Sequence, residues 1–270
     1  MSVPDRQTAK RPLEGLGILI TRPAHQAHGL AELIARLGGK SIRFPTIEIT
    51  RPANDDGLEK SLTNLTKSTI AIFVSVSAVR ETFAYLRAHG RHFPADAGVF
   101  CVGSASAKAL VAAGVDNPIW PRERFDTEAL LDLPELNDIR GKQIFIFRGD
   151  GGRALLGAAL AERGAQVEYA ECYRRIRPHV DSDWLLQCWR RGEIHVVSVT
   201  SVVGLRNLYD MVGEAGRAEL LATPVVVVSQ RIANVCRELG FMTQPMIAAE
   251  SSDEAIVATI RTWRTTQNSL

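Results

Sequence analysis

The stretch IFIFRGDGGRALLGAAL, residues 144–160, holds the pattern from which the fold of the chain can be worked out. An apolar run leads into Arg-Gly-Asp-Gly-Gly-Arg, and an apolar-periodic segment follows. Such an order predicts a strand, a tight glycine turn and a helix in succession. The stretch raises two questions: whether the unit is repeated along the chain, and whether its turn binds a ligand.

The unit is repeated, because GILITRP at 17–23 resembles QIFIFRG at 143–149, with Arg22 and Arg148 standing 126 positions apart. The same shift, without a gap, places IFVSVSAVR at 72–80 on SVTSVVGLR at 198–206, VFCVGSASAKALVAAGV at 99–115 on VVVVSQRIANVCRELGF at 225–241, and TEALL at 127–131 on DEAIV at 253–257. One shift that aligns four strand-helix junctions indicates a tandem duplication.

Each copy alternates short runs rich in Val and Ile with amphipathic segments, which is typical of parallel strands covered by helices on both faces. We expect strands near residues 17–21, 40–44, 70–75, 98–103, 143–148, 166–171, 195–200 and 224–229. The predicted fold is therefore α/β, with two similar doubly wound parallel-sheet lobes. The extended stretches 41–50 and 167–178 contain Pro45 and Pro178 and show no helix signal, so we expect them to connect the lobes.

The bulk composition excludes several classes of protein. The 270 residues carry a net charge of +2, which excludes a general nucleic-acid binder but allows a local basic cleft. No apolar run is long enough to span a membrane, and the N-terminal residues lack the apolar segment of a signal peptide. The four cysteines form no C-x-x-C motif, so we expect reduced, buried thiols. Together these features predict a cytoplasmic protein.

The glycine turn at residues 149–152 has two interpretations. Gly149-x-Gly151-x-x-Ala154 fits a dinucleotide-binding fingerprint, so a nucleotide-dependent α/β enzyme that uses the Gly149–Gly152 loop stays open as an alternative. Two facts count against it. The duplicate TRPAHQAHGL has no glycine before Gly29, and Arg148 and Arg153 occupy a region that such loops keep small. No P-loop motif is present.

Six of the eight predicted strands end in a small hydroxyl, a glycine or an arginine. These residues are Thr21, Arg22, Ser75, Gly103, Ser104, Arg148, Gly149, Thr200, Ser201, Ser229 and Arg231. In open α/β sheets, ligands bind at the carboxyl ends of strands, where helix N-termini offer unpaired N–H groups. Two such edges facing a common cleft predict a ligand with many anionic groups. A non-catalytic two-lobed anion binder is a second alternative.

The chain resembles the uroporphyrinogen-III synthase family over residues 15–262. The resemblance rests on the order and spacing of ITRPAHQAHGLAELIARLGG, FPTIEI, IFVSVSAV, CVGSASAKAL, FRGDGGRALL, YAECYRR, VVSVTSVVGLRNL and VVVVSQRIA. It implies one discontinuous lobe of residues 1–43 plus 174–270, a second lobe of residues 50–166, and linkers at 44–49 and 167–173.

The resemblance also implies a function. Members of the family are lyases of porphyrin and haem biosynthesis that close hydroxymethylbilane, a linear tetrapyrrole with eight carboxylate groups, into uroporphyrinogen III. Water is lost and ring D is inverted, without a metal or an organic cofactor. His25 and His28 lack a third ligand nearby, which agrees with the absence of a metal site. We expect a monomer, whose substrate the preceding enzyme of the pathway can pass on.

The resemblance points to Tyr173, in YAECYRR, as the catalytic residue, which donates a proton to the leaving hydroxyl or holds a bridging water. The alternative is a tyrosine that only packs against the linker. Thr200 and Ser201 would bind acetate or propionate arms, unless they only cap a helix. Ser75 and Ser77 are their counterparts in the first repeat.

The other implied substrate contacts supply backbone and cationic donors. Gly103 and Ser104 would offer backbone N–H groups, and Ser229 replaces a glycine found in many relatives. The remaining expected contacts are Thr21, Arg22, Arg148, Gly149, Gly151, Arg153 and Arg231. Arginines at such an edge bind carboxylates bidentately, or are simply solvated charges.

Overall fold

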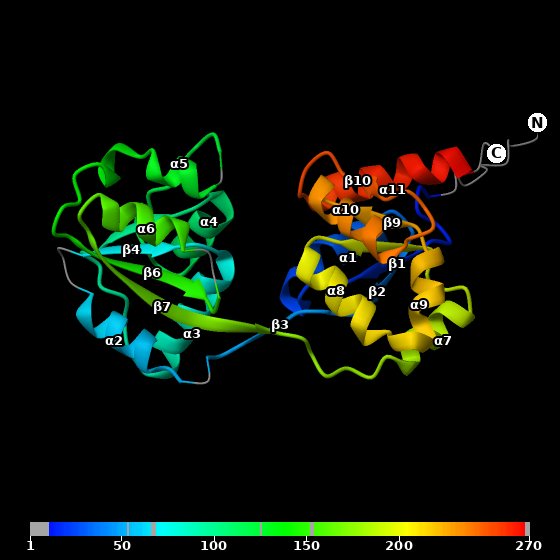
Figure 1. Cartoon of the computed structure of the whole chain (residues 1–270), viewed down its shortest axis with the longest axis horizontal. Helices are drawn as coiled ribbons and strands as arrows, with labels where there is room; N and C mark the ends of the chain where they lie inside the picture. The colour runs from blue at the N-terminus through cyan, green and yellow to red at the C-terminus, as the bar shows by residue number, and fades with distance from the viewer. Residues whose placement is uncertain (1–10, 53, 66–68, 125, 152–153, 268–270) are drawn as a thin grey trace, which may run out of the picture. The chain divides into compact units, whose positions relative to one another are not determined.

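The computed structural model describes residues 11–52, 54–65, 69–124, 126–151 and 154–267. It contains two compact units, and each is built around a five-stranded sheet (Figure 1). Unit 1 comprises Met1–Glu48 and Ile176–Leu270, and unit 2 comprises Ile49–Arg175. The strands pair in parallel and helices cover the sheets, so the predicted α/β fold class is confirmed.

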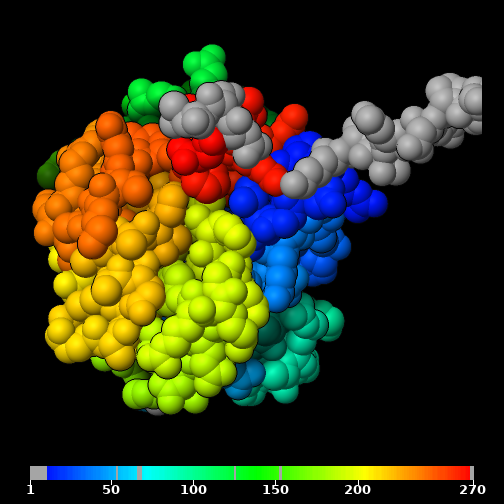
Figure 2. Space-filling model, turned by 90° about the vertical axis from the view of Figure 1, so that its right-hand side faces the viewer, coloured from blue at the N-terminus to red at the C-terminus, as the bar shows by residue number. Residues whose placement is uncertain are grey.

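The sheet of unit 1 has the order β10-β9-β8-β1-β2. Its strands are β1 (Gly17–Ile20), β2 (Lys40–Arg43), β8 (Val196–Val199), β9 (Val225–Val227) and β10 (Met246–Ile247). One face is covered by α1 (His28–Arg36) and α11 (Asp253–Gln267), and the other by α7 (Asp183–Arg190), α8 (Val202–Met211), α9 (Gly213–Ala222) and α10 (Gln230–Leu239). Figure 2 shows α7, α9 and α10 as one continuous surface of yellow-green, yellow and orange atoms.

The sheet of unit 2 has the order β3-β7-β6-β4-β5. Its strands are β3 (Glu48–Thr50), β4 (Ile70–Phe73), β5 (Gly98–Cys101), β6 (Gln143–Gly149) and β7 (Gln166–Ile176). The helices α2 (Asp56–Asn64), α3 (Val76–Ala88) and α4 (Ser104–Ala112) cover one face, and α5 (Thr127–Leu131) and α6 (Leu155–Glu162) cover the other. Two short 3-10 helices, η1 (Ala24–Gln26) and η2 (Pro134–Leu136), complete the elements.

The duplication explains why the two sheets have the same strand order. Under the shift of 126 positions, β9-β8-β1-β2 of unit 1 becomes β5-β4-β6-β7 of unit 2. The strands β1, β2, β4 and β5 come from the first copy, and β6, β7, β8 and β9 come from the second. Each sheet therefore combines two of these strands from each copy, and β10 in unit 1 and β3 in unit 2 complete the five.

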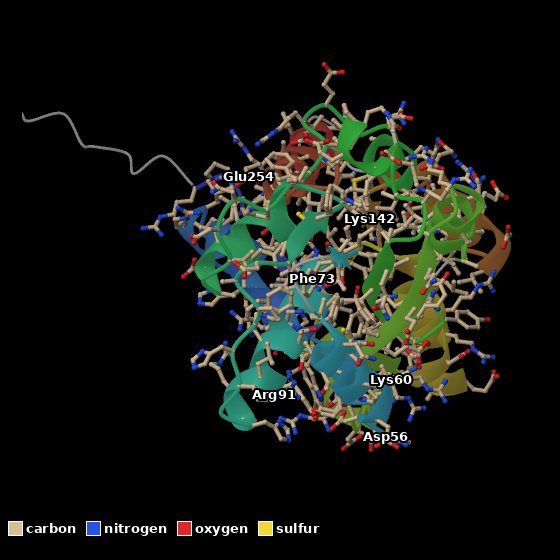
Figure 3. All side chains as sticks on the ribbon, turned by 90° about the vertical axis from the view of Figure 1, so that its left-hand side faces the viewer. Asp56, Lys60, Phe73, Arg91, Lys142 and Glu254 are labelled. Atoms are coloured by element: carbon tan, nitrogen blue, oxygen red, sulfur yellow. The ribbon has the colours of Figure 1, made fainter. Side chains whose placement is uncertain are left out.

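Strand side chains are buried on both faces, as expected for parallel strands between two helix layers. In β1, Ile18 and Ile20 pack with α1 and α11, whereas Leu19 packs against the opposite helices. In unit 2, Phe73 and Phe147 stack with their ring centroids 4.6 Å apart. Figure 3 shows Phe73 in the interior, with Asp56 and Arg91 at the surface.

All eight predicted strands are present, with ends that differ by up to five residues. The sequence missed β3 and β10, which are edge strands of three and two residues, too short for a periodic signal. The segment 167–173, which was expected to link the lobes, pairs with β6 from Val167 to Tyr173.

The four cysteines are free and buried, as the sequence predicted. Among the described residues, no helix is long and apolar enough to cross a membrane.

Candidate functional site

Tyr173 lies in β7 next to the carboxyl ends of β6 and β4, and only 1% of its surface is exposed. Its hydroxyl oxygen is 3.1 Å from the hydroxyl of Ser75 and accepts a hydrogen bond of 2.8 Å from the guanidinium of Arg175. The same guanidinium lies over the phenol ring, 5.3 Å from its centroid. Tyr173 is therefore buried, but its hydroxyl belongs to a polar cluster at the strand ends.

The donors of this cluster can be counted. Ser75 caps α3, because its side-chain oxygen accepts a hydrogen bond of 3.1 Å from the backbone N–H of Ala78. Arg175 has no acceptor, so it must donate to the oxygen of Tyr173. The bond between the two hydroxyls uses only one of their two protons, whichever group donates. Within the described residues, the pair thus keeps one proton that it can donate to a ligand.

Gly149 is required by the packing of Tyr173. A Cβ atom at Gly149 would lie 2.5 and 2.6 Å from two ring carbons of Tyr173, closer than real atoms approach. The backbone N–H of the next residue, Asp150, donates to the carbonyl of Tyr173 at 2.9 Å. This glycine therefore lets the backbone of β6 approach the phenol, which explains it without a bound nucleotide. Gly151 has φ +63°, a conformation that favours glycine, and is exposed.

Arg175 is the functional candidate that the sequence analysis did not assign. Residues two apart in a strand point to the same face, so Tyr173 and Arg175 lie together, whereas Arg174 points the other way and pairs with Asp150 at 3.5 Å. The alternation of side chains along a strand would have identified Arg175 if the strand expected at 166–171 had been extended to include it. Pro178 and the lack of a helix signal after it led us to interpret residues 167–178 as a connection.

The cysteines of unit 2 are poor candidates for catalysis. Burial raises the pKa of Cys101 to about 11 and that of Cys172 to about 12. Both thiols therefore stay protonated at neutral pH and are weak nucleophiles. Among the described residues, no group of three or more His, Cys, Asp or Glu side chains could hold a metal ion.

The other predicted residues of unit 2 differ in their accessibility. Ser77 is buried in the first turn of α3, while Gly103 and Ser104 are half-buried at the start of α4, which has no side-chain cap. The Arg148 guanidinium lies 4.4 Å from the centroid of the Tyr169 ring, and it pairs with Glu171 at 3.8 Å. Arg153 lies outside the described residues.

In unit 1, two of the predicted residues are engaged in internal contacts. Thr21 is buried, and its hydroxyl donates to the carbonyl of Ser198 at 2.8 Å. The hydroxyl of Thr46 donates in turn to the carbonyl of Thr21 at 3.1 Å. Arg22 forms an ion pair with Asp253, the first residue of α11. These contacts hold the end of β1 against β8 and α11.

The serines of unit 1 cap helices, as the alternative interpretation expected. Ser201 accepts a hydrogen bond of 3.0 Å from the N–H of Gly204, at the start of α8. Ser229 accepts one of 3.4 Å from the N–H of Ile232, at the start of α10. A cap uses the oxygen as an acceptor, so each hydroxyl proton can still be donated to a carboxylate. Thr200 is half-buried and Arg231 is exposed at the same edge.

Comparison with known proteins shows the family. Residues 28–258 match the family model described as uroporphyrinogen-III synthase HemD. The chain belongs to the uroporphyrinogen-III synthase family. It is 35% identical over 239 residues to the uroporphyrinogen-III synthase of Salmonella typhimurium, and the match covers 88% of this chain and 96% of the relative. The chain is therefore an enzyme of this family, and the resemblance inferred from the motifs is confirmed.

Solved structures of uroporphyrinogen-III synthases have the same fold. A mutant enzyme from Thermus thermophilus superposes with a TM-score of 0.59 at 20% identity, covering 93% of this chain and 99% of that one. The Helicobacter pylori protein gives a TM-score of 0.60 at 14% identity, over 92% and 99% of the two chains. At such low identity these structures support the α/β fold of the family and not the roles of individual residues.

Proposed function

We propose that the chain closes hydroxymethylbilane into uroporphyrinogen III, with inversion of ring D and loss of water, and that Tyr173 supplies the proton. The observation that carries this proposal is the hydroxyl pair of Tyr173 and Ser75, which keeps one proton to donate beside the guanidinium of Arg175. Hydroxide leaves carbon poorly, so a positioned proton donor accelerates the first step.

The chemistry follows from the electron flow in the substrate. The phenol of Tyr173, directly or through Ser75 or a water, protonates the terminal hydroxyl, which leaves as water while the adjacent pyrrole nitrogen pushes electrons. The phenolate that forms is stabilised by the guanidinium that already donates to its oxygen. The azafulvene-like cation attacks the substituted carbon of the last ring and forms a spiro centre. Fragmentation and reclosure then invert that ring, and the proton released when the pyrrole regains its aromaticity returns to the phenolate.

Inversion requires that the flexible substrate be held in one conformation, since spontaneous closure gives the uninverted isomer. Positioning is therefore the second part of the proposal. In unit 2, the uncapped start of α4 offers the N–H groups of Gly103 and Ser104 to carboxylate arms. In unit 1, Thr200, Ser201 and Ser229 offer hydroxyl protons. Each donor lies at the carboxyl edge of a sheet.

The scheme needs only a proton donor and carboxylate-binding groups, so we propose that no metal or organic cofactor takes part. We further propose that the enzyme acts as a monomer in the cytoplasm and receives its substrate from the enzyme that makes hydroxymethylbilane. These points concern the assembly and location of the enzyme and the source of its substrate, and not the reaction itself. Gel filtration with light scattering at assay concentration tests the monomer, and a dimer mass would contradict it.

The decisive assay couples enzymatic production of hydroxymethylbilane to this protein, oxidises the product and separates the porphyrin isomers. We expect the type III isomer in excess. Only the type I isomer, as forms without a synthase, would overturn the proposal and leave an anion-binding protein. A shift of the melting temperature with NAD or ATP would instead favour a nucleotide enzyme.

A further inference from the structure

An open groove of about 740 Å³ runs along α4 in unit 2, beyond the cluster around Tyr173. Its lining includes Ser104 at the start of α4, Lys108 and Val111 further along the helix, and Trp120 and Arg122 from the segment after it. Val111 is 58% exposed. The volume falls in the range of small-molecule sites.

The groove begins at the carboxyl edge of the sheet. Ile119 forms a parallel bridge with Phe100 of β5, because its N–H donates to Val99 at 2.8 Å and its carbonyl accepts from Cys101 at 2.9 Å. The next residue, Trp120, therefore lies level with the end of β5. The start of α4 follows that same strand end, so the groove is continuous with the donors proposed for the substrate.

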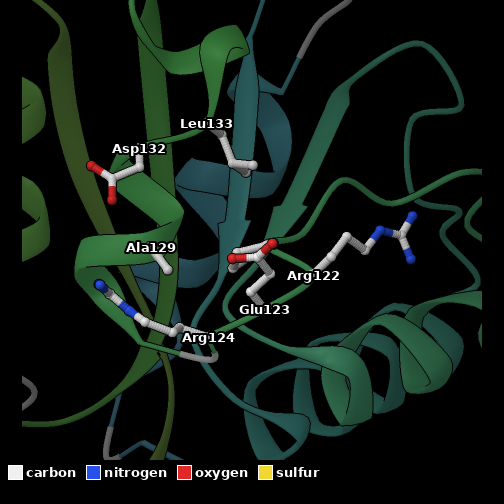
Figure 4. A pocket seen from close by; sticks show the side chains of 7 residues that line it. Arg122, Glu123, Arg124, Ala129, Asp132 and Leu133 are labelled. Atoms are coloured by element: carbon white, nitrogen blue, oxygen red, sulfur yellow. The ribbon is translucent and has the colours of Figure 1, made fainter.

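The charge of the groove favours an anion. Lys108 and Arg122 are exposed, they form no ion pair with another described residue, and none of the described lining residues carries a carboxylate. A neighbouring hollow has a mixed charge instead. It is lined by Arg122, Arg124, Glu123 and Asp132, and Arg124 is neutralised by Asp126 at 3.2 Å (Figure 4). Arg122 borders both hollows and points away from this acidic pair.

The ring of Trp120, which lines the groove, favours a flat ligand. The guanidinium of Arg122 lies over the ring of Trp120, 4.1 Å from its centroid. A guanidinium in this position is held over the ring while its edge stays available for a carboxylate. Together the indole, the guanidinium and the exposed valine form a surface suited to a planar heterocycle that carries carboxylate arms.

The duplication shows that the fold does not require these side chains. Under the shift of 126 positions, Lys108 corresponds to Asn234, Trp120 to Met246 and Arg122 to Ala248. The equivalent part of unit 1 therefore folds with neither a cation nor an indole at these three positions. Their presence in unit 2 calls for an explanation other than folding.

We propose that this groove is a subsite for one carboxylate-bearing pyrrole ring of the substrate, with Lys108 and Arg122 binding its arms and Trp120 supporting the ring. The proposal rests on the proposed function for the identity of the ligand, and on the groove itself for its chemical class. It goes beyond the strand-end donors, because it assigns specificity to side chains on the far part of α4 and after it.

Steady-state kinetics with hydroxymethylbilane test the subsite. We expect the double variant K108A/R122A to raise KM at least tenfold, because it removes charge-assisted contacts, and to change kcat less than about twofold. The matched control is K142A, which removes an exposed lysine just before β6, at the amino edge of the same sheet. An unchanged KM in the double variant overturns the proposal.

A binding experiment keeps the test separate from catalysis. A monopyrrole with one acetate and one propionate arm is titrated into the full chain, and the indole N–H signal of Trp120, assigned with a W120F variant, is followed by NMR. We expect saturable shifts in the wild type and in K142A, with at least tenfold weaker binding in K108A/R122A. If the wild type makes no type III isomer but binds the monopyrrole in this way, the proposed function fails and the anion groove stands. No shift of the Trp120 signal overturns the groove.

Discussion

The strand-end edges of the two units share a helix-capping serine, but the tyrosine and arginine beside it in unit 2 are replaced in unit 1. Ser75 and Ser201 are equivalent in the duplication, and each caps the helix that follows its strand, at 3.1 and 3.0 Å. Tyr173, however, corresponds to Ile47, and Arg175 corresponds to Ile49. The serine therefore belongs to the shared fold, whereas the equivalent edge of unit 1 is built without the tyrosine and the arginine. The comparison supports the proposal that places the proton chemistry in unit 2.

The arginines that end β1 and β6 show the same divergence. Arg22 is bound to Asp253 at the start of α11, whereas Arg148 packs over Tyr169 and lies near Glu171. Neither is an unpaired cation, so the arginines with the clearest link to the site are Arg175, through Tyr173, and Arg122, in the groove. The predictions below test this division of roles between the two units.

The largest effect is expected from Tyr173→Phe. The ring keeps its packing against Gly149, and the loss of the hydroxyl removes the proton donor, so kcat should fall about 100-fold while the fold persists. The matched control is Tyr169→Phe in the same strand, whose hydroxyl makes only a weak contact of 3.5 Å with the carbonyl of Ala154. Equal kcat values for the two variants would contradict the proposed role of the Tyr173 hydroxyl as the proton donor.

A smaller loss should follow from Gly149→Ala, since the new methyl group displaces the phenol ring. We expect kcat to fall about tenfold, because small misplacements of catalytic groups are costly. We also expect the free energy of unfolding to drop by about 1–3 kcal/mol. Gly57→Ala in α2 is the control, because a Cβ there meets nothing within 4 Å and helix propensity improves. An active, stable Gly149→Ala enzyme would contradict the packing argument.

The paired variants Ser75→Ala and Ser201→Ala test the comparison directly. Each removes a helix cap, so chemical denaturation should show a similar loss of about 1 kcal/mol in both. Only Ser75→Ala breaks the hydroxyl pair, so it should lower kcat about tenfold, whereas Ser201→Ala removes a proposed contact to a carboxylate arm and should mainly raise KM. If Ser201→Ala slows kcat as much, unit 1 takes part in the chemistry.

The smallest effect concerns the amino edge of unit 1, where Glu193 accepts from Lys40 at 2.8 Å and from Arg191 at 2.6 Å. These contacts lower its pKa from 4.5 to about 2. A lowered folded-state pKa adds stability that is fully present above pH 4.5 and is lost as the pH falls through 2.

The melting temperature of Glu193→Gln should therefore lie below that of the wild type near neutral pH, with the difference narrowing between pH 4.5 and 2. Activity should not change, because this edge is remote from the strand ends of the same sheet. A difference in melting temperature that stays constant from pH 4.5 to pH 2 would show that the ion pairs of Glu193 do not cause it.

The sequence was sufficient for the elements that repeat. The apolar runs and their shift of 126 positions predicted eight strands and the α/β class, because buried parallel strands leave a strong compositional signal. The strands β3 and β10 were missed, since two or three residues at a sheet edge have no periodicity to detect. Strand β7 was identified only up to residue 171. Its last five residues were missed because no helix follows them to mark the end of the strand.

The candidate site was less predictable. The resemblance singled out Tyr173 and its neighbours by motif, but the contact between Tyr173 and Ser75 joins residues 98 positions apart, which no local pattern reveals. Arg175 could have been assigned from the alternation of residues along a strand. No signal in the sequence identifies Trp120, because its position depends on the bridge between Ile119 and Phe100. The roles of the predicted substrate contacts stay predictions.

The most direct test of the account is a double-mutant cycle on kcat with Tyr173→Phe and Arg175→Gln. Arg175 contacts the phenol oxygen, so it should act through Tyr173. We predict that Arg175→Gln alone lowers kcat about tenfold, and that it changes kcat little once Phe occupies position 173. Effects that multiply independently in the double variant would contradict the claim that the two residues form one proton-donating unit.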